Sequence, residues 1–492
     1  MNNIPFITII LAMTGSIVAL LLGKRPKTAH LLTQVIMIVT AVLTAFMIPY
    51  FYHNGGTITY MLGHFPAPWG NELRFGLTES ILACVFSIVM FLAVIGGRNG
   101  MEEDIQQSKQ NCYDSLLLLV LMSLLALIYT NDIFTAYVFI EINTIASCGI
   151  VMVKESGETL KATIKYLFMS LMASGLFLIS VAMLYAVTGH LLIPQLSAAV
   201  ADLSAAGSYT MPLMAAAVLM TVSLGVKSAM FPFHTWLPDA HSTATTTSSS
   251  ILSGVVVKGY IILLIKIYYR VFGIELIRKT GILHVIFVLG LVGMIMGSVF
   301  AIREHNVKRM IAYSSVAQIG YIYAGIGLGT WAGLSAALFH MIIHAFTKPL
   351  LFSSAGGLIE VSGHSKEIRD LTGAGHRNKW AAAGFIIGAC SMVGVPLFGG
   401  FTSKVYLAIS GQDKSLIFIL ALALSSCLNA IYYMPVALRI LTGASGTEET
   451  AERSQGAPEF VLSIGCFSAI NIALGICGLV LISMLMQGVQ IL

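Results

Sequence analysis

The feature that most constrains this chain is a succession of about fourteen apolar runs separated by polar connections. A helix rises about 1.5 Å per residue, so about 20 apolar residues cross the roughly 30 Å hydrocarbon core of a bilayer. Inside that core each backbone polar group must be satisfied within the protein, and a helix does this by itself. The sequence therefore predicts an all-α polytopic membrane protein. The predicted spans are residues 4–23, 29–51, 77–96, 112–130, 133–153, 163–188, 211–230, 251–272, 281–302, 308–328, 331–355, 380–409, 415–440 and 458–487.

Composition agrees with this prediction. Hydrophobic residues make up 57% of the 492 residues and charged residues only 10%, whereas an ordinary globular domain is about 25% charged. The net charge of +5 is small for this length, so we expect no nucleic-acid partner. The seven cysteines lack the paired spacing that holds zinc or an iron–sulfur cluster, and we interpret them as small apolar core residues.

Basic residues gather in alternate connections between the predicted spans. By the positive-inside rule these connections are cytoplasmic. The first apolar run has no cleavage-site pattern and is expected to be a retained span, so both termini are predicted to lie outside. The basic residues of the predicted cytoplasmic set are Lys24, Arg25, Lys27, Arg98, Lys109, Lys154, Lys161, Arg303, Lys308, Arg309, Lys366, Arg369, Arg377, Lys379, Arg439 and Arg453, and those of the opposite set are Arg74, Arg270, Arg278, Lys279 and Lys414.

Two spans are interrupted by proline. Pro232 and Pro238 surround His234, and Pro396 precedes a glycine pair. Broken helices are tolerated in a membrane only where the freed backbone groups are buried in protein or line a wet cavity. Breaks at corresponding places in two halves are typical of inverted repeats with an ion site between them. The alternative is two unrelated proline kinks.

We therefore predict one transmembrane domain, residues 1–492, with two inverted five-helix repeats and two broken helices. Its predicted parts are N-terminal helices in 1–111, a first repeat in 112–272, a second repeat in 281–440 and a C-terminal helix in 441–492.

Four ionisable residues lie well inside apolar spans or beside a break: Glu141, Lys227, Lys258 and Lys404. A charged side chain at the centre of a span costs at least about 2.5 to 3.5 kcal/mol. Glu141 is therefore expected to have a cationic partner, with Lys227 and Lys258 as candidates. Lys266 lies nearer the end of its span, so both snorkelling toward the headgroups and a functional role stay open.

His340, His344 and Lys348 are spaced at i, i+4 and i+8. This spacing places them on one stripe of a helix, about 6 Å apart along the axis. Histidine titrates near physiological pH, which suits a proton relay. A metal site is the alternative, but the pattern lacks the glutamate of a metalloprotease helix and an obvious third ligand. We expect no metal and, since nucleotide and redox motifs are missing, no cofactor.

Three further residues accompany this set. His234 and His241 flank the first break, and a run of hydroxyl residues follows at 242–250. These hydroxyls are expected to satisfy loose backbone groups or to order water. Asp132 precedes the span of Glu141 and is interpreted as a helix N-cap in preference to a relay member.

These motifs resemble the antiporter-like membrane subunits shared by respiratory complex I, the Mrp cation/proton antiporters and the membrane-bound hydrogenases. The resemblance covers about residues 75–440. It rests on segments 139–141, 225–241, 309–315, 340–348 and 401–404 together with Lys258.

The resemblance implies fourteen helices with two inverted repeats and a relay of named residues. In it Glu141 pairs with Lys227, Lys258 connects through His340 and His344, and Lys404 serves the other half-channel. Segment 242–250 departs from the family because it contains no proline, which leaves the role of His241 open.

The implied function is a non-redox subunit that moves protons, or protons exchanged for sodium. It would belong to a multisubunit respiratory complex of the Mrp, membrane-bound hydrogenase or complex I type, with other membrane subunits as partners, in the plasma (inner) membrane of a prokaryote. The chain ends soon after the last span, so we expect no long lateral helix. An independent secondary transporter of a small solute is the alternative, since it too uses inverted repeats and broken helices. A purely structural scaffold would leave the costly buried charges unexplained.

Overall fold

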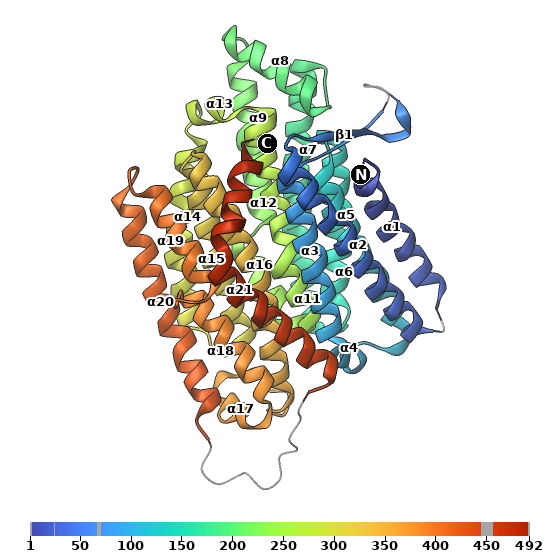
Figure 1. Ribbon diagram of the computed structural model, residues 1–492, viewed down its shortest axis with the longest axis vertical. Helices are drawn as coiled ribbons and strands as arrows, with labels where there is room; N and C mark the ends of the chain where they lie inside the picture. Colours follow the sequence, from blue (N-terminus) through green and yellow to red (C-terminus); the bar gives the residue numbers. More distant parts are fainter. Residues whose placement is uncertain (1, 24, 66–69, 444–455, 491–492) are drawn as a thin grey trace.

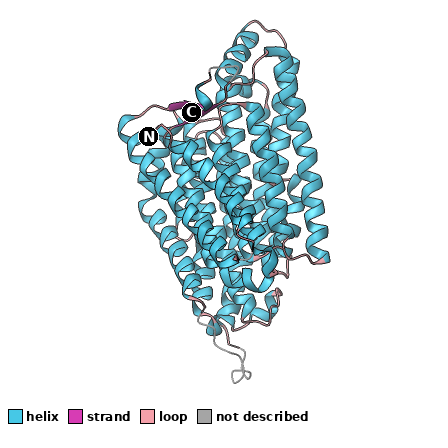
Figure 2. Cartoon of the chain, turned by 90° about the vertical axis from the view of Figure 1, so that its right-hand side faces the viewer, coloured by secondary structure: helices cyan, strands magenta, loops and turns pink. Residues whose placement is uncertain are grey.

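The computed structural model describes residues 2–23, 25–65, 70–443 and 456–490. Most of these residues are helical, and the long helices run side by side along the longest axis of the molecule (Figures 1 and 2). Strands β1 (Ile58–Met61) and β2 (Glu72–Phe75) form an antiparallel pair in which Ile58 lies opposite Phe75. Lys24 and Arg453, which enter the predicted orientation, lie outside the described residues.

Helices of the first half follow the predicted spans closely. The long ones are α1 (Ile4–Leu21), α2 (Pro26–Asn54), α3 (Leu77–Gly96), α5 (Gln110–Tyr129), α6 (Ile133–Met152), α7 (Gly157–Thr188) and α9 (Thr210–Lys227). The shorter ones are α4 (Arg98–Asp104), α8 (Ile193–Ala205), α10 (Leu237–Thr243), α11 (Thr246–Ile251), α12 (Val257–Lys266) and α13 (Ile274–Lys279).

The π-helical turn Leu252–Val256 joins α11 to α12, and a second π-helical turn, Ile267–Val271, extends α12, so that Thr246–Val271 forms one continuous span. The second half contains α14 (Ile282–Ile302), α15 (Val307–Gly327), α16 (Trp331–Glu360), α17 (Ala374–Arg377), α18 (Lys379–Val393), α19 (Gly399–Gly411), α20 (Leu416–Leu441) and α21 (Pro458–Val489).

Twelve helices of the described chain are long and apolar enough to cross a membrane, compared with about fourteen predicted spans. The other two predicted spans are helical but differ in kind. The span predicted at 308–328 is α15, which is 21 residues long but has Lys308 and Arg309 in its first turn and includes several serine and tyrosine residues. The span predicted at 380–409 is divided into α18 and α19. The chain is thus a polytopic all-α membrane protein, while the count of fourteen and the inverted repeats stay predictions.

Two spans form the centre of the bundle. The most apolar stretches of Thr246–Val271 and α16 are 100% buried within the protein, whereas that of α21 is only 22% buried. In a membrane the outer helices face lipid, whereas protein shields these two stretches on every side. The residues within them are therefore removed from lipid and from bulk water.

Both predicted breaks interrupt helices. Helix α9 ends at Lys227, and a left-handed residue, Ala229 (φ +56°), turns the chain before α10 begins with Pro238 in its first turn. Helix α18 ends at Val393, and Gly394 (φ +91°) turns the chain toward α19. The φ of Gly394 is one that favours glycine because it has no Cβ.

The cysteines fit their prediction only in part. Cys84 and Cys148 are buried, but Cys112, Cys427 and Cys477 are exposed on the outside of the helices. An apolar thiol faces lipid as readily as it faces a core, so apolar runs alone do not distinguish the two environments.

Figure 1 places the start of α1 and the end of α21 at the same end of the bundle, while α4 and α17 lie at the opposite end. The first and last long helices of the described chain therefore begin and end, respectively, at the same end of the bundle.

Candidate functional site

Lys258 lies at the centre of the bundle and is fully buried. Its ammonium group donates a hydrogen bond to the carbonyl oxygen of Ser253, in the π-helical turn one turn earlier on the same span. The hydroxyl of Ser253 in turn lies 3.0 Å from that of Ser315 on α15. The lysine is thus bound to a neutral carbonyl oxygen, and the side chain of the same serine links the central span to α15.

The predicted stripe on α16 faces the interior. His340, His344 and Lys348 are all fully buried. The Nδ1 atom of His340 lies at hydrogen-bonding distance, 2.9 Å, from the Ser403 hydroxyl of α19. Both ring nitrogens of His344 and the Nε2 atom of His340 have no hydrogen-bond partner in the described chain. Buried polar atoms without a protein partner are the usual positions of internal water.

Lys348 lies at the other end of this stripe and is bound to α15. Its ammonium donates to the carbonyl oxygen of Ile311 at 3.0 Å and to the hydroxyl of Ser314, both on α15. The two central spans thus carry Lys258, His340, His344 and Lys348 in the buried interior of the bundle.

The lysine at the first break is bound to the helix of Glu141. Lys227 is 1% exposed, and its ammonium donates to the Thr144 hydroxyl of α6 at 2.8 Å. Thr144 lies one turn after Glu141, whose Oε1 atom is buried without a hydrogen-bond partner in the described residues. No ion pair within 4.0 Å joins Glu141 to Lys227 there. The link between the two helices thus runs through a hydroxyl group and not through a direct ion pair.

The lysine at the second break closes the end of a helix. Lys404 donates to the carbonyl oxygens of Met392 (2.7 Å) and Val393 (3.0 Å), which end α18, and to the hydroxyl of Ser426 (3.1 Å). The last carbonyls of a helix are unpaired and carry partial negative charge, which attracts a cation. A Cβ atom on Gly394 would lie 3.2 Å from Cδ of Lys404, so the glycine also makes room for this lysine. Pro396 lies within the same break.

Lys266 does not reach the surface. It is 1% exposed and donates to the carbonyl oxygens of Ile128 and Thr130 at 2.7 Å each and to that of Leu127 at 3.3 Å. The snorkelling alternative is therefore wrong, because the unpaired carbonyls at the end of α5 hold the ammonium inside.

Asp132 caps α6, as predicted. Its carboxylate accepts a hydrogen bond of 2.7 Å from the backbone N–H of Thr135. This is the ordinary contact of a helix N-cap.

The hydroxyl run after the first break satisfies backbone groups. Thr245 caps α11 by accepting from the N–H of Ser248 at 3.1 Å, and Ser249 donates to the carbonyl of His241 at 3.2 Å. This N-cap begins α11 shortly after α10, in a segment that contains no proline.

The two histidines near the first break lie against aromatic rings. The ring of His241 is fully buried and stacks on Phe352 at 4.7 Å, and both its nitrogens lack partners in the described chain. The ring of His234 stacks on Phe231 at 5.3 Å and on Phe300 at 5.7 Å, beside Pro232.

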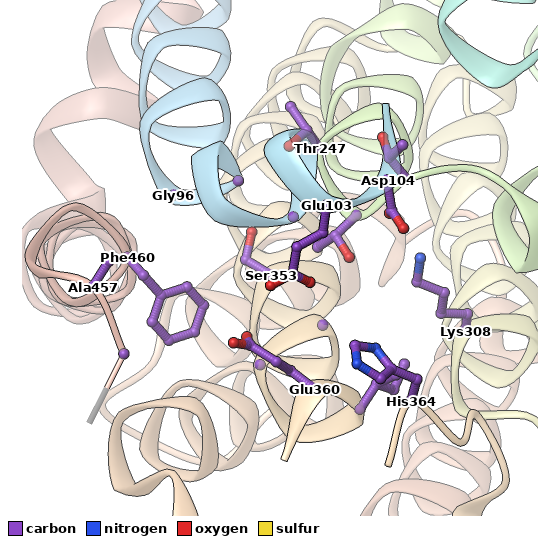
Figure 3. A pocket seen from close by; sticks show the side chains of 18 of the residues that line it. Gly96, Glu103, Asp104, Thr247, Lys308, Ser353, Glu360, His364, Ala457 and Phe460 are labelled. Atoms are coloured by element: carbon purple, nitrogen blue, oxygen red, sulfur yellow. The ribbon is translucent and has the colours of Figure 1, made fainter. Parts of the chain in front are cut away.

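A cavity of about 340 Å³ opens at the end of the bundle where α3, α4, α11, α16 and α21 meet. Figure 3 shows Glu103, Glu360 and Ser353 around this cavity, with Lys308 and His364 to their right in the view. The hydroxyl of Ser353 lies 3.4 Å from that of Ser250 on α11. The cavity thus touches hydroxyl groups of both central spans. The sequence alone does not reveal this cavity, because its charged residues lie in connections and at helix ends, where charge is ordinary.

Two tyrosines were missed as well. The Nζ atoms of Lys227 and Lys404 lie 5.6 Å and 5.3 Å from the ring centres of Tyr260 and Tyr321. Aromatic residues are common in apolar spans, so the sequence contains no signal that singles them out.

Comparison with known proteins agrees with the resemblance seen in the motifs. Residues 130–429 match the family described as NADH:quinone oxidoreductase/Mrp antiporter, transmembrane. The NADH-quinone oxidoreductase subunit N of Desulforudis audaxviator (strain MP104C) is 31% identical over 381 residues, which cover 77% of this chain and 74% of that protein. A Na(+)/H(+) antiporter subunit of Alkalihalophilus pseudofirmus (strain ATCC BAA-2126 / JCM 17055 / OF4) is 25% identical over 478 residues, or 96% of this chain and 94% of that protein.

The fold is also shared with a solved structure. A chain in the structure of the membrane-bound sulfane sulfur reductase, an archaeal respiratory membrane complex, superposes with a TM-score of 0.90 at 24% sequence identity. The superposition covers 99% of this chain and 97% of that one. The family match spans more than half of the chain, and the chain therefore belongs to the NADH:quinone oxidoreductase/Mrp antiporter family of transmembrane proteins.

Proposed function

We propose that this chain moves protons, or protons exchanged for sodium, along a buried line of ionisable residues. The line runs from Glu141 and Lys227 to Lys258, then through His340 and His344, and ends at Lys404, with Lys348 and His241 beside it. The observation that carries the proposal is the burial of Lys258, His340 and His344 on the two central spans, which protein shields on every side.

Neutral partners leave these lysines electrostatically coupled to one another. In the described chain the ammonium groups of Lys227, Lys258 and Lys404 bind hydroxyl and carbonyl oxygens. A charge without a counter-ion acts over a long distance in a medium of low dielectric constant. Protonation of one lysine therefore disfavours protonation of the next, which passes a change of charge along the line.

The cavity at the end of the bundle supports access for ions from that side. Basic residues of the predicted cytoplasmic set, Lys154, Lys308 and Lys366, line it, and both termini lie at the opposite end (Figure 1). We place the cavity on the cytoplasmic side and both termini outside the plasma membrane. The repeats 112–272 and 281–440 would then contribute one break lysine each.

Relatives named as subunits of an oxidoreductase and of an antiporter support a place in a multisubunit complex. In this proposal other membrane subunits are the partners, and they supply the redox reaction or ion gradient that drives transport. A complex of the Mrp, membrane-bound hydrogenase or complex I type fits the family.

An independent transporter of a small solute would need a pocket near the middle of the membrane. The 340 Å³ cavity lies instead at one end, lined by residues such as Glu103 and Glu360. This position favours ion access over solute binding. A scaffold role would not require charges on the most deeply buried spans.

The deciding experiment compares Lys258→Ala with Lys279→Ala, a control lysine that is exposed at the surface. Proton transport is measured in membrane vesicles that contain the whole complex, together with the amount of complex assembled. We expect Lys258→Ala to assemble and to lose transport, while Lys279→Ala keeps it. Wild-type transport by an assembled Lys258→Ala complex would refute the proposed relay.

A further inference from the structure

Each lysine at a helix break lies over the ring of a buried tyrosine. The ammonium of Lys227 is 5.6 Å from the ring centre of Tyr260, and that of Lys404 is 5.3 Å from the ring centre of Tyr321. Both distances are within the roughly 6 Å over which a cation is attracted to an aromatic face. Both tyrosines are almost completely buried. The same arrangement thus occurs twice, once at each break.

Each ring is also held by a second contact. The hydroxyl of Tyr260 donates to Oδ1 of Asn143 on α6 at 2.8 Å. The residue after Asn143 is Thr144, whose hydroxyl accepts the hydrogen bond of Lys227. The ring of Tyr321 stacks on the imidazole of His340, with 5.2 Å between centres and 24° between planes. Each ring is therefore held by a contact other than its lysine.

An aromatic ring stabilises a cation without neutralising it. The ring carries a partial negative charge on its face but no net charge, and the attraction is stronger where water is excluded. A carboxylate in the same place would stabilise the ammonium too, but it would also cancel its field. A relay that works by charge acting on charge needs the field to persist.

We propose that Tyr260 and Tyr321 are positioning residues that hold the charged forms of Lys227 and Lys404 at the breaks while leaving their charge effective. This inference rests on the proposed function and adds two residues to it. Tyr321 has the larger role, because its ring contacts both Lys404 and His340. The place of the charged lysine and the orientation of the imidazole are coupled through this one side chain.

The test separates the ring of Tyr321 from its hydroxyl group. Tyr321→Phe keeps the ring, and Tyr321→Leu removes it. Proton transport is measured as a function of pH in vesicles that contain the whole complex. We expect Tyr321→Phe to keep the wild-type rate and pH profile. Tyr321→Leu is expected to be slower by on the order of tenfold and to show a midpoint at lower pH, because charged Lys404 loses a stabilising contact.

Tyr268→Leu is the matched control for loss of packing. Tyr268 is also fully buried, and its hydroxyl bonds Thr221 at 2.8 Å. The control is expected to keep the midpoint of the pH profile. An equal shift in Tyr268→Leu, no shift in Tyr321→Leu, or an equal loss in Tyr321→Phe would overturn the inference. If Tyr321→Leu does not accumulate in the membrane, Tyr260→Leu decides by the same criteria at the first break.

Lys404→Ala distinguishes this inference from the function on which it rests. Wild-type transport by Lys404→Ala would refute both the proposed relay and the role of the tyrosines. If Lys404→Ala is inactive while Tyr321→Leu and Tyr260→Leu behave as wild type, the relay stands and the role of the tyrosines falls.

Discussion

The ammonium group of Lys404 lies 2.7 Å from the carbonyl oxygen of Met392, at the end of the helix that the second break interrupts. One side chain thus satisfies the loose end of a helix and places a charge in the interior. The break and the lysine depend on each other, because an unsatisfied buried carbonyl is costly and an unpaired buried ammonium is more so.

This relationship predicts different outcomes for two substitutions. Lys404→Ala removes the donor to the carbonyl of Val393 and one of two donors to that of Met392, which also accepts from Asn429 at 3.0 Å, so we expect a loss of stability of about 1–3 kcal/mol together with loss of transport. Lys404→Arg keeps a donor but does not release its proton, so it should retain more stability than the alanine variant and still lose transport. Thermal unfolding of the purified complex and proton transport in vesicles measure the two effects. An active Lys404→Arg variant would contradict a proton-carrying role.

Glu141→Gln should abolish transport without weakening the fold. The Oε1 atom of Glu141 is buried without a partner in the described chain, so an amide of the same shape removes the charge and no known contact. The control is Glu275→Gln, the same substitution at an exposed glutamate that pairs with Arg278. Equal transport rates in the two variants would show that the charge of Glu141 is dispensable.

Thr144 offers a test of the hydroxyl link to Lys227. Thr144→Val removes the acceptor of the 2.8 Å hydrogen bond, and we expect a loss of about 1–3 kcal/mol in stability and slower transport. Thr144→Ser keeps the hydroxyl and should remain near wild type. Thermal unfolding of the purified complex measures the stability, and proton transport in vesicles measures the rate. Identical behaviour of the valine and serine variants would indicate that the hydrogen bond has no role.

Filling the cavity should slow transport. Gly100 lines the cavity, and a Cβ atom there would meet nothing within 4 Å, so Gly100→Trp places a large side chain in the opening without a clash at Cβ. Gly465→Trp is the matched control, because Gly465 has the same free space but lies on α21 away from the cavity lining. We expect only Gly100→Trp to reduce the transport rate. Unchanged transport in a well-assembled Gly100→Trp complex would place the access route elsewhere.

Asp239 predicts a dependence of stability on pH. Partial burial raises the pKa of Asp239, but hydrogen bonds from Lys165 and Arg309, each at 2.7 Å, outweigh it and leave the pKa below its ordinary value. A carboxylate with a lowered pKa stabilises the fold above its unfolded pKa of about 3.9, and this stability is lost as the pH falls through the folded pKa. The difference in melting temperature between wild type and Asp239→Asn should therefore be largest near neutral pH and shrink below about pH 4. A constant difference would exclude this linkage.

Local sequence was sufficient to predict a polytopic helical membrane protein and the positions of both breaks. Long apolar runs specify membrane helices because a helix satisfies all its backbone hydrogen bonds within one segment, as the lipid environment requires. Pro232, Pro238 and Pro396 mark the breaks because proline lacks the N–H that a helix needs. Glu141, Lys227 and Lys258 were recognised because charge in an apolar run is expensive whatever the fold. The motifs around them identified the family.

Tertiary structure alone decided the partners of these charges. Lys266 binds a carbonyl oxygen of α5, far away in the sequence, and Lys404 binds one at the end of the preceding helix, α18. The rings of Tyr260 and Tyr321 lie below Lys227 and Lys404, respectively. Such contacts depend on how helices pack across the bundle. The sequence determined which charges lie within the membrane spans, because the cost of burying a charge depends on the apolar run around it. The fold decided what holds each charge there, because every partner comes from another helix or from another turn of the same one.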